Sequence, residues 1–216
     1  MGGRSGCLAT LALAAGLFVA CTPKKRPEAL APEPKADVEA NIAAFENRKR
    51  YPVLTVAILK QIPDADLEQA LTDFVDCKLE KSGDREREVF SALSPGFRAV
   101  FSTSVLEGEV DNGGFNQFFW NSSGAYAADA VAGLELLGAT AHARLMRRAI
   151  SIRDADRART QTFKSRGTIE AFSESYKNNR LNDLDREFYK LANLSQARIK
   201  FVRARPELFV GTCGTG

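Results

Sequence analysis

Apolar residues recur at helical spacing along most of the chain after residue 36. The clearest example follows Ser94 and Pro95, a capping residue and a proline suited to the first helical position. Phe97, Val100 and Phe101 come next, at three- and four-residue intervals that place them on one face of a helix. Comparable patterns predict helices over residues 37–50, 64–80, 95–111, 126–137, 140–150, 168–177, 182–192 and 195–205.

The same pattern gives little indication of β-structure. No segment alternates apolar and polar residues as an amphipathic strand does, and no repeat of 20–50 residues recurs. A chain of 216 residues fits one domain with appendages. We therefore predict an all-α fold, with a single compact domain of about eight or nine helices over residues 37–216.

The centre of the chain carries two adjacent glycines followed by a dense group of aromatic and amide residues. Residues 112–114 read Asn-Gly-Gly, which supports a continuous helix poorly because glycine tolerates positive φ and pays more conformational entropy in a helix. We expect the helix from residue 95 to end here and a short helix to restart at Phe115. Its Phe118 and Phe119 are expected to face the core together with Phe115.

Amide side chains share this short helix with Trp120, the only tryptophan of the chain. One interpretation is that they bond the backbone of flanking loops and brace a broken helix. The other is that they line a recognition groove of the kind that takes sugars or peptides. The candidate binding residues are Asn112, Gly113, Gly114, Gln117, Trp120 and Asn121.

Residues 1–20 have the features of a secretory leader. Arg4 precedes an apolar run that ends at Ala20, and this run is shorter than the roughly 20 residues that a membrane span needs. Residues 18–21 resemble a bacterial lipoprotein box, with Phe18 where that box usually has leucine and Cys21 as the lipid-bearing residue. The alternative is an ordinary cleaved leader in which Cys21 has no special role.

Residues 21–36 are expected to form a tether. They hold four of the chain's eight prolines, which favours an extended spacer between a lipid anchor and the domain. With acyl chains such as palmitate on Cys21, the domain would face the periplasm from a bilayer of the cell envelope. By resemblance to the Gram-negative sorting rule, Thr22 after Cys21 implies the outer membrane where the host has one.

Charge is balanced overall but unevenly placed. The sequence holds 30 basic and 27 acidic residues, of which five and two fall within residues 1–36, so residues 37–216 hold 25 of each. This balance supports neither a nucleic-acid binder nor an acidic decoy, and we expect no nucleic-acid partner. Residues 64–88 are acidic and residues 144–166 basic, which is typical of solvated helix faces that can pair with one another. A sharper hypothesis is a contact surface for an anionic partner, formed by Arg147, Arg148, Arg153, Arg157 and Arg159.

Two cysteines remain once Cys7 leaves with the leader and Cys21 carries lipid. An oxidising compartment would allow Cys77 and Cys213 to form a disulfide, which would close a very long loop. Spacing alone leaves the free and bridged states open, because geometry decides between them.

Signs of catalysis are weak. His142 is the only histidine and lies on the apolar face of its helix, so we interpret it as a packing residue, and no metal-ligand spacing is present. We expect neither a metal nor another cofactor. Glu107 and Asp111 share a helix face and form the best carboxylate pair for acid–base work on a glycan. The commoner interpretation is an acidic helix end beside a turn.

The residues Asp-Asn-Gly-Gly-Phe-Asn-Gln-Phe-Phe-Trp-Asn at 111–121, the alanine-rich helix that ends at residues 134–139, and Leu-Asn-Asp-Leu-Asp-Arg-Glu-Phe-Tyr at 181–189 resemble the bacterial DNA-mimic protein family. The resemblance covers roughly residues 85–209. It implies an all-helical fold that is often dimeric, in a domain otherwise of unknown function. The naming member presents an acidic surface in place of DNA. The neutral domain and basic residues 144–166 depart from that surface.

Together these features favour a lipid-anchored envelope protein that acts by binding an envelope protein or polymer. No catalytic site is evident, and the family resemblance is compatible with a homodimer. A glycan hydrolase using Glu107 and Asp111 is the first alternative. A DNA-mimic regulator of a DNA-binding protein is the second.

Overall fold

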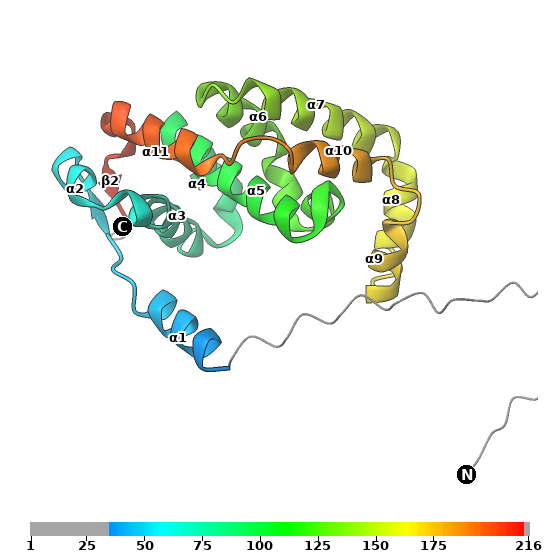
Figure 1. Cartoon of the computed structure of the whole chain (residues 1–216), viewed down its shortest axis with the longest axis horizontal. Coiled ribbons are helices and arrows are strands. Elements are labelled where there is room, and N and C mark those ends of the chain that lie inside the picture. Colours follow the sequence, from blue (N-terminus) through cyan, green and yellow to red (C-terminus); the bar gives the residue numbers. More distant parts are fainter. Residues whose placement is uncertain (1–34, 214–216) are drawn as a thin grey trace, which may run out of the picture. The chain divides into compact units, whose positions relative to one another are not determined.

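Figure 1 shows the computed structural model, which describes residues 35–213. The chain divides into two units, residues 1–48 and 49–216. Helix α1 (Lys35–Glu46) belongs to the first, and all other elements belong to the second. The predicted leader, Cys21 and most of the predicted tether lie outside the described residues. Helix α1 begins two residues inside that tether, because Pro34 is the last proline before Pro52 and nothing between them blocks a helix.

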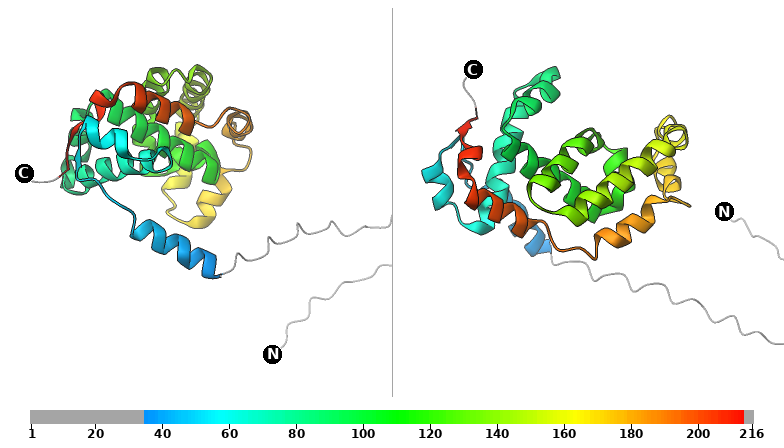
Figure 2. Two further views of the ribbon diagram at one scale, coloured as in Figure 1. Left: turned by 60° about the vertical axis from the view of Figure 1, so that its left-hand side comes forward. Right: turned by 90° about the horizontal axis from the view of Figure 1, so that it is seen from above.

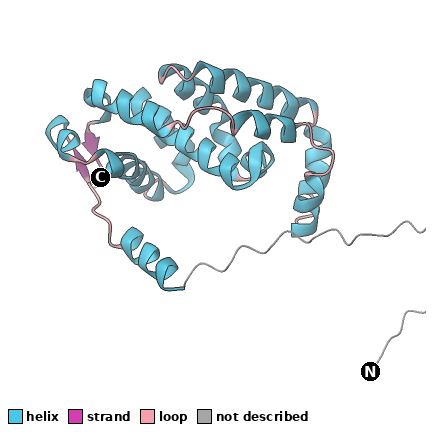
Figure 3. Ribbon diagram, viewed as in Figure 1, coloured by secondary structure: helices cyan, strands magenta, loops and turns pink. Residues whose placement is uncertain are grey.

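The fold is all-α, as predicted, and only two very short strands interrupt the helices (Figure 3). The elements after α1 are β1 (Val53–Leu54), α2 (Val56–Gln61), α3 (Asp64–Glu80), η1 (Gly83–Arg85), α4 (Glu86–Ala92), α5 (Pro95–Trp120), η2 (Ser122–Tyr126), α6 (Ala127–Leu136), α7 (Thr140–Ala155), α8 (Arg157–Lys164), α9 (Ile169–Ser175), α10 (Leu181–Phe188), α11 (Ser195–Ala204), η3 (Pro206–Phe209) and β2 (Gly211–Thr212).

Each predicted segment contains a helix, and three short helices were missed. Helices α3, α5 and α7 start at the predicted residues, and the hydroxyl of Ser94 accepts a hydrogen bond from the backbone N–H of Phe97 at 3.3 Å. The described residues form eleven α-helices instead of eight or nine. Helices α2, α4 and α8 were not predicted, because each spans only six to eight residues, about two turns, which is too short for a helical period to be recognised.

Helix α5 passes through two hydrophobic clusters that form the core of residues 49–213. Its first half, with Phe97 and Val100, packs among residues of α3, α4, α11 and η3. Its second half, with Phe115 and Phe118, packs among residues of α6, α7 and α10. Helix α6 lies along α5 and α7 lies beside α6 (Figure 2). The predicted core face of the restarted helix is therefore confirmed.

The C-terminal segment is tied to the start of the compact unit. Strands β1 and β2 pair antiparallel, with Val53 opposite Thr212, and the backbone N–H of Cys213 donates to the carbonyl of Pro52 at 2.6 Å. Cys213 is disulfide-bonded to Cys77 of α3 across 136 residues of sequence, with a Cα–Cα distance of 6.0 Å. The bridged state, one of the two alternatives that spacing left open, is the one formed. In the chain-entropy description, a disulfide that closes a loop of this length stabilises the fold by about 4–5 kcal/mol, because it restricts the unfolded chain.

No single helix among the described residues has the length and apolar character needed to cross a membrane. One bent pair, Gly83–Ala92 followed by Pro95–Trp120, meets the requirement by length and composition alone.

Candidate functional site

Helix α5 breaks where the two glycines predict it. Gly113 has φ −159° and ψ 26°, and Gly114 has φ 71° and ψ 179°, so neither is helical. Gly114 lies in the left-handed range of φ that favours glycine. An added Cβ there would also lie 2.3 Å from Oδ2 of Asp185. The break is thus required both by local backbone conformation and by the close approach of α10.

Side chains from α10 and from the residues that directly follow α9 and α10 bond backbone groups at the break. The carboxylate of Asp185 accepts from the backbone N–H of Phe115 at 2.8 Å and so caps the second half of α5. The hydroxyls of Tyr176 and Tyr189 donate to the carbonyls of Gly113 and Val110, at 2.8 and 2.7 Å. Burial raises the pKa of Asp185 above its ordinary value, although the bond from Phe115 lowers it in part.

A buried asparagine completes this connection. Asn116 donates to the hydroxyl of Ser175 at 2.7 Å and accepts from the side-chain amide of Asn179 at 2.8 Å. The stretches 111–121 and 181–189, which carried the family resemblance as separate motifs, therefore meet at one place in the fold. Asp185 and Tyr176 were missed from the sequence. Asp185 lay within the matched stretch 181–189 but had no assigned role, and nothing in the sequence pointed to Tyr176.

An open groove of about 630 Å³ lies beside the second half of α5. Four of the six predicted binding residues line it: Asn112, Gln117, Trp120 and Asn121. Gly113 and Gly114 do not, since they form the break. The remaining lining residues come from the end of α8, the following loop and α9; they are Lys164, Gly167, Thr168, Ile169 and Phe172.

Two of the three amides that line this groove share one carboxylate. Glu109 accepts from Nε2 of Gln117 at 2.8 Å, from Nδ2 of Asn121 at 2.9 Å and from the hydroxyl of Ser123. Burial alone raises the pKa of Glu109, but the hydrogen bonds from Ser123, Gln117 and Asn121 outweigh it and leave that pKa lowered. The partner of these amides is therefore a carboxylate of the same helix, Glu109, and not the loop backbone that the sequence suggested as one alternative.

Aromatic and aliphatic surface forms the rest of the groove. The ring of Trp120 is half-buried and lies 5.0 Å from that of Phe172, and the ammonium of Lys164 is 5.8 Å from the indole. Ile169 is 80% exposed, an unusual exposure for a large aliphatic side chain at a cavity. The groove therefore combines an aromatic platform, amide oxygens and one cation.

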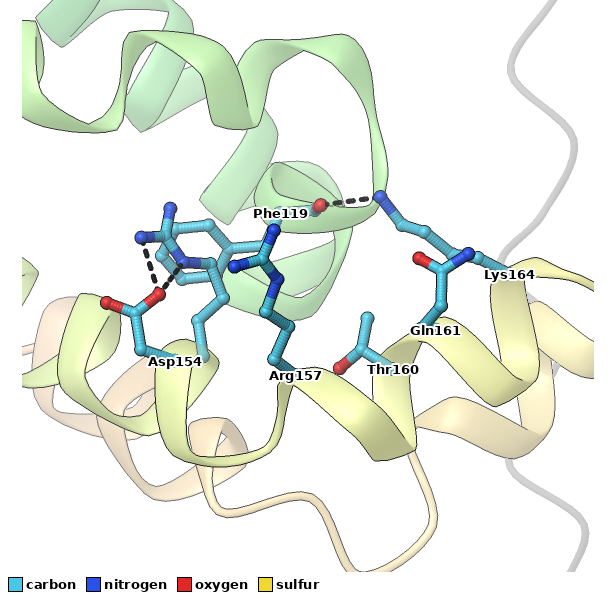
Figure 4. Close-up of a pocket in the computed structure, with 7 residues that line it drawn as sticks. Phe119, Asp154, Arg157, Thr160, Gln161 and Lys164 are labelled. Atoms are coloured by element: carbon cyan, nitrogen blue, oxygen red, sulfur yellow. Dashed lines mark hydrogen bonds and ion pairs between the residues drawn. The ribbon is translucent and has the colours of Figure 1, made fainter.

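The five predicted surface arginines separate into two groups. Arg147 pairs with Glu135, Arg148 pairs with Glu187, and Arg159 donates to the carbonyl of Lys177 at 2.6 Å. The other two, Arg153 and Arg157, line a second cavity of about 350 Å³ (Figure 4). Lys164 lines both cavities.

One member of the predicted carboxylate pair, Glu107, is held by a buried arginine. Arg198 is 3% exposed in its side chain and forms ion pairs with Glu68 and, at 2.5 Å, with Glu107. Glu107 also accepts from the backbone N–H of Leu194 at 3.0 Å. Burial, and secondly the charge of Glu107, raises the pKa of Asp111.

His142 is buried and packs edge-on against Phe188 with ring centroids 5.4 Å apart, as predicted for a packing histidine. Burial lowers its pKa. Within residues 35–213, no group of three or more His, Cys, Asp or Glu side chains is arranged to hold a metal ion.

Comparison with protein families gives one match, to the model described as DMP19-like protein, over residues 91–205. Searches of curated proteins and of solved structures gave no match. The matched span begins just before α5 and ends just after α11, so it contains the break, the groove and the second cavity.

Proposed function

This chain belongs to the DMP19-like protein family, and we propose that it acts as a lipid-anchored binding protein of the cell envelope. The anchor is Cys21, supported by the apolar leader before it and the proline-rich spacer after it. The domain then faces the periplasm on a tether and works by holding a ligand. Replacing Cys21 with serine should release the chain from sedimented membranes, whereas an unchanged membrane fraction would contradict the anchor.

One observation carries the binding proposal. Four residues singled out for their chemistry, Asn112, Gln117, Trp120 and Asn121, line one groove. Gln117 and Asn121 both donate to Glu109, which fixes the orientation of the two amides, and their side-chain carbonyl oxygens accept no hydrogen bond from the described residues. Fixed acceptors beside an aromatic ring suit the hydroxyls and apolar faces of a saccharide. We therefore propose envelope polysaccharide as the ligand class.

The test is co-sedimentation of the chain with purified cell-wall polysaccharide. We expect Trp120→Ala to weaken binding by at least tenfold, because it removes the platform of the groove. Val210→Ala is the matched control, since Val210 is also an exposed apolar residue and lines neither cavity. Equal binding by the wild type and Trp120→Ala, or no binding by the wild type, would contradict the proposal.

Hydrolysis and DNA mimicry have less support. Glu107 is engaged by Arg198 and by the backbone of Leu194, which leaves a hydrolase without an accessible second carboxylate beside Asp111. A DNA mimic needs an acidic surface, and residues 37–216 hold equal numbers of acidic and basic residues. We expect the wild type to show no glycan turnover, so Glu107→Gln should change only the stability of the protein. We also expect no competition between this chain and duplex DNA for a DNA-binding protein.

A further inference from the structure

The cavity of Figure 4 has an unusual wall. It lies against Phe119 near the end of α5, and one side of it is formed by Arg157, Thr160, Gln161 and Lys164 of α8. The last three of these residues follow Arg157 by three, four and seven positions, so all four lie on one face of the helix. Figure 4 shows the side chains of Arg157, Thr160 and Gln161 directed from α8 toward Phe119. A wholly polar helix face thus borders a cavity.

The positive charge of this cavity exceeds its negative charge. Asp154 is the single acidic residue of the lining, and its carboxylate already accepts from Nε of Arg153 at 2.9 Å. Arg157 forms no hydrogen bond or ion pair within the part of the chain that the structure describes. Two cations of the lining, Arg157 and Lys164, therefore have no carboxylate partner among the described residues.

Lys164 is held in place without being neutralised. Its ammonium donates to the carbonyl of Phe119 at 3.0 Å, which uses one of its three hydrogens. Burial lowers the pKa of Lys164, as expected for a cation with reduced hydration and no counter-ion. An anion in the cavity would supply the missing charge and accept the remaining hydrogens.

We propose that this cavity binds a phosphate monoester group. A phosphate monoester carries a charge of about −1.5 to −2 at neutral pH and three acceptor oxygens, which matches the two cations that have no carboxylate partner among the described residues. The guanidinium of Arg157, the ammonium of Lys164, the hydroxyl of Thr160 and the amide of Gln161 are all donors along one helix face. A carboxylate, with one charge and two oxygens, fits this donor set less well. The proposal does not depend on a ligand in the groove, although Lys164 borders both cavities.

The chain contains its own reporter for this site. Trp120 is the only tryptophan, and its indole lies 5.8 Å from the ammonium of Lys164. We propose a titration of the full chain with inorganic phosphate at pH 7.5 and constant ionic strength, followed by tryptophan fluorescence and by calorimetry. We expect a saturable change that sodium acetate does not produce. A response to phosphate no larger than the response to chloride would overturn the proposal.

Variants that remove one positive charge distinguish specific phosphate binding in the cavity from non-specific attraction of phosphate to a basic surface. Arg157→Gln and Lys164→Gln should each weaken phosphate binding by at least tenfold. Arg147→Gln removes the same charge at a paired arginine outside both cavities, and it should change binding less than twofold. Arg157 is exposed, so its variant is expected to fold even if Lys164→Gln unfolds. Equal weakening by Arg147→Gln and Arg157→Gln would overturn the proposal.

Two sources in the envelope carry this chemistry, a lipid headgroup and a phosphorylated sugar. Dibutyryl phosphatidic acid and glucose 1-phosphate, titrated under the same conditions, distinguish them. The source is the probe that binds at least tenfold tighter than inorganic phosphate in an Arg157-dependent way. If neither probe does so and phosphate still binds, the site is one for free phosphate and the monoester proposal is overturned. Binding of the lipid alone, unaffected by Arg157→Gln, would contradict a phosphoryl site.

Discussion

Two polar regions border the second half of α5, and they differ in how completely their hydrogen bonds are made. At the break, Asp185, Tyr176 and Asn116 bond to groups on other segments at 2.7–2.8 Å. On the cavity face of α8, Arg157 has no partner among the described residues, and Lys164 has one carbonyl. The first region is closed on itself, whereas the second is open toward a cavity.

The difference indicates where to look for function. Polar groups that satisfy one another stabilise a fold, because each one left unpaired on burial costs about 1–3 kcal/mol. Polar groups that face a cavity without partners contribute little to the fold and are available to a ligand. By this criterion the glycine motif, the most distinctive stretch of the sequence, is structural. Its neighbours in the groove and on α8 are the candidates for binding.

Gly114→Ala should produce the largest effect and would test the closed region. The substitution places a Cβ against Asp185 at a positive φ, so we expect a loss of about 3 kcal/mol in the free energy of unfolding. Urea unfolding measures it. Gly108→Ala is the control within the same helix, because nothing lies within 4 Å of its added Cβ. That variant should gain about 0.5–1 kcal/mol. Equal effects of the two variants would refute a special role for the break.

Tyr176→Phe should have the next largest effect. It leaves the carbonyl of Gly113 without its hydrogen bond, which we expect to cost about 1–2 kcal/mol in the free energy of unfolding. Tyr51→Phe is the matched control, because the structure gives the hydroxyl of Tyr51 no hydrogen bond among the described residues, and its effect should stay within about 0.5 kcal/mol. A loss in both variants of the same size would show that the contact at the break is not specific.

Asp185→Asn should change the pH dependence of stability. Burial raises the pKa of Asp185, so protonation favours the folded state, and this contribution is present below the ordinary value of 3.8 and lost as pH rises through the folded pKa. Asparagine keeps an acceptor for Phe115 and does not titrate. Relative to this variant, the wild type should therefore lose stability as pH rises across that window. A difference between the two proteins that is constant with pH, measured by urea unfolding, would contradict the assigned direction.

Arg157→Gln should have the smallest effect on stability and would test the open region. Its side chain is exposed and makes no bond within residues 35–213, so we expect a change within about 0.5 kcal/mol. The same variant should lose phosphate binding. If Arg157→Gln kept full phosphate binding, or lost as much stability as Tyr176→Phe, the distinction between a structural region and a binding region would be contradicted.

The sequence alone predicts much of the fold. Long apolar periods predict α3, α5 and α7, and two adjacent glycines locate the break in α5. Helix α8 was not predicted, because none of its residues is buried and it therefore lacks an apolar stripe.

Some of the residues that line the groove were singled out from the sequence. Trp120 and the amides were chosen by residue type, and the structure places them beside one groove. Their partners were not predicted. Glu109 accepts from Gln117 and Asn121 across the break in α5, and Lys164 approaches the ring of Trp120 only after α8 has folded back on α5. Whether a carboxylate binds an amide, an arginine or nothing depends on tertiary contacts that spacing along the chain does not contain.

The most direct measurement is an NMR titration of the ¹⁵N-labelled chain with inorganic phosphate at constant ionic strength. The open cavity predicts saturable shifts in amides of residues 153–164 and in the indole of Trp120, with amides of residues 113–116 unchanged. Shifts centred on residues 113–116 would contradict the account, because the region assigned as closed would then be the one that responds to ligand.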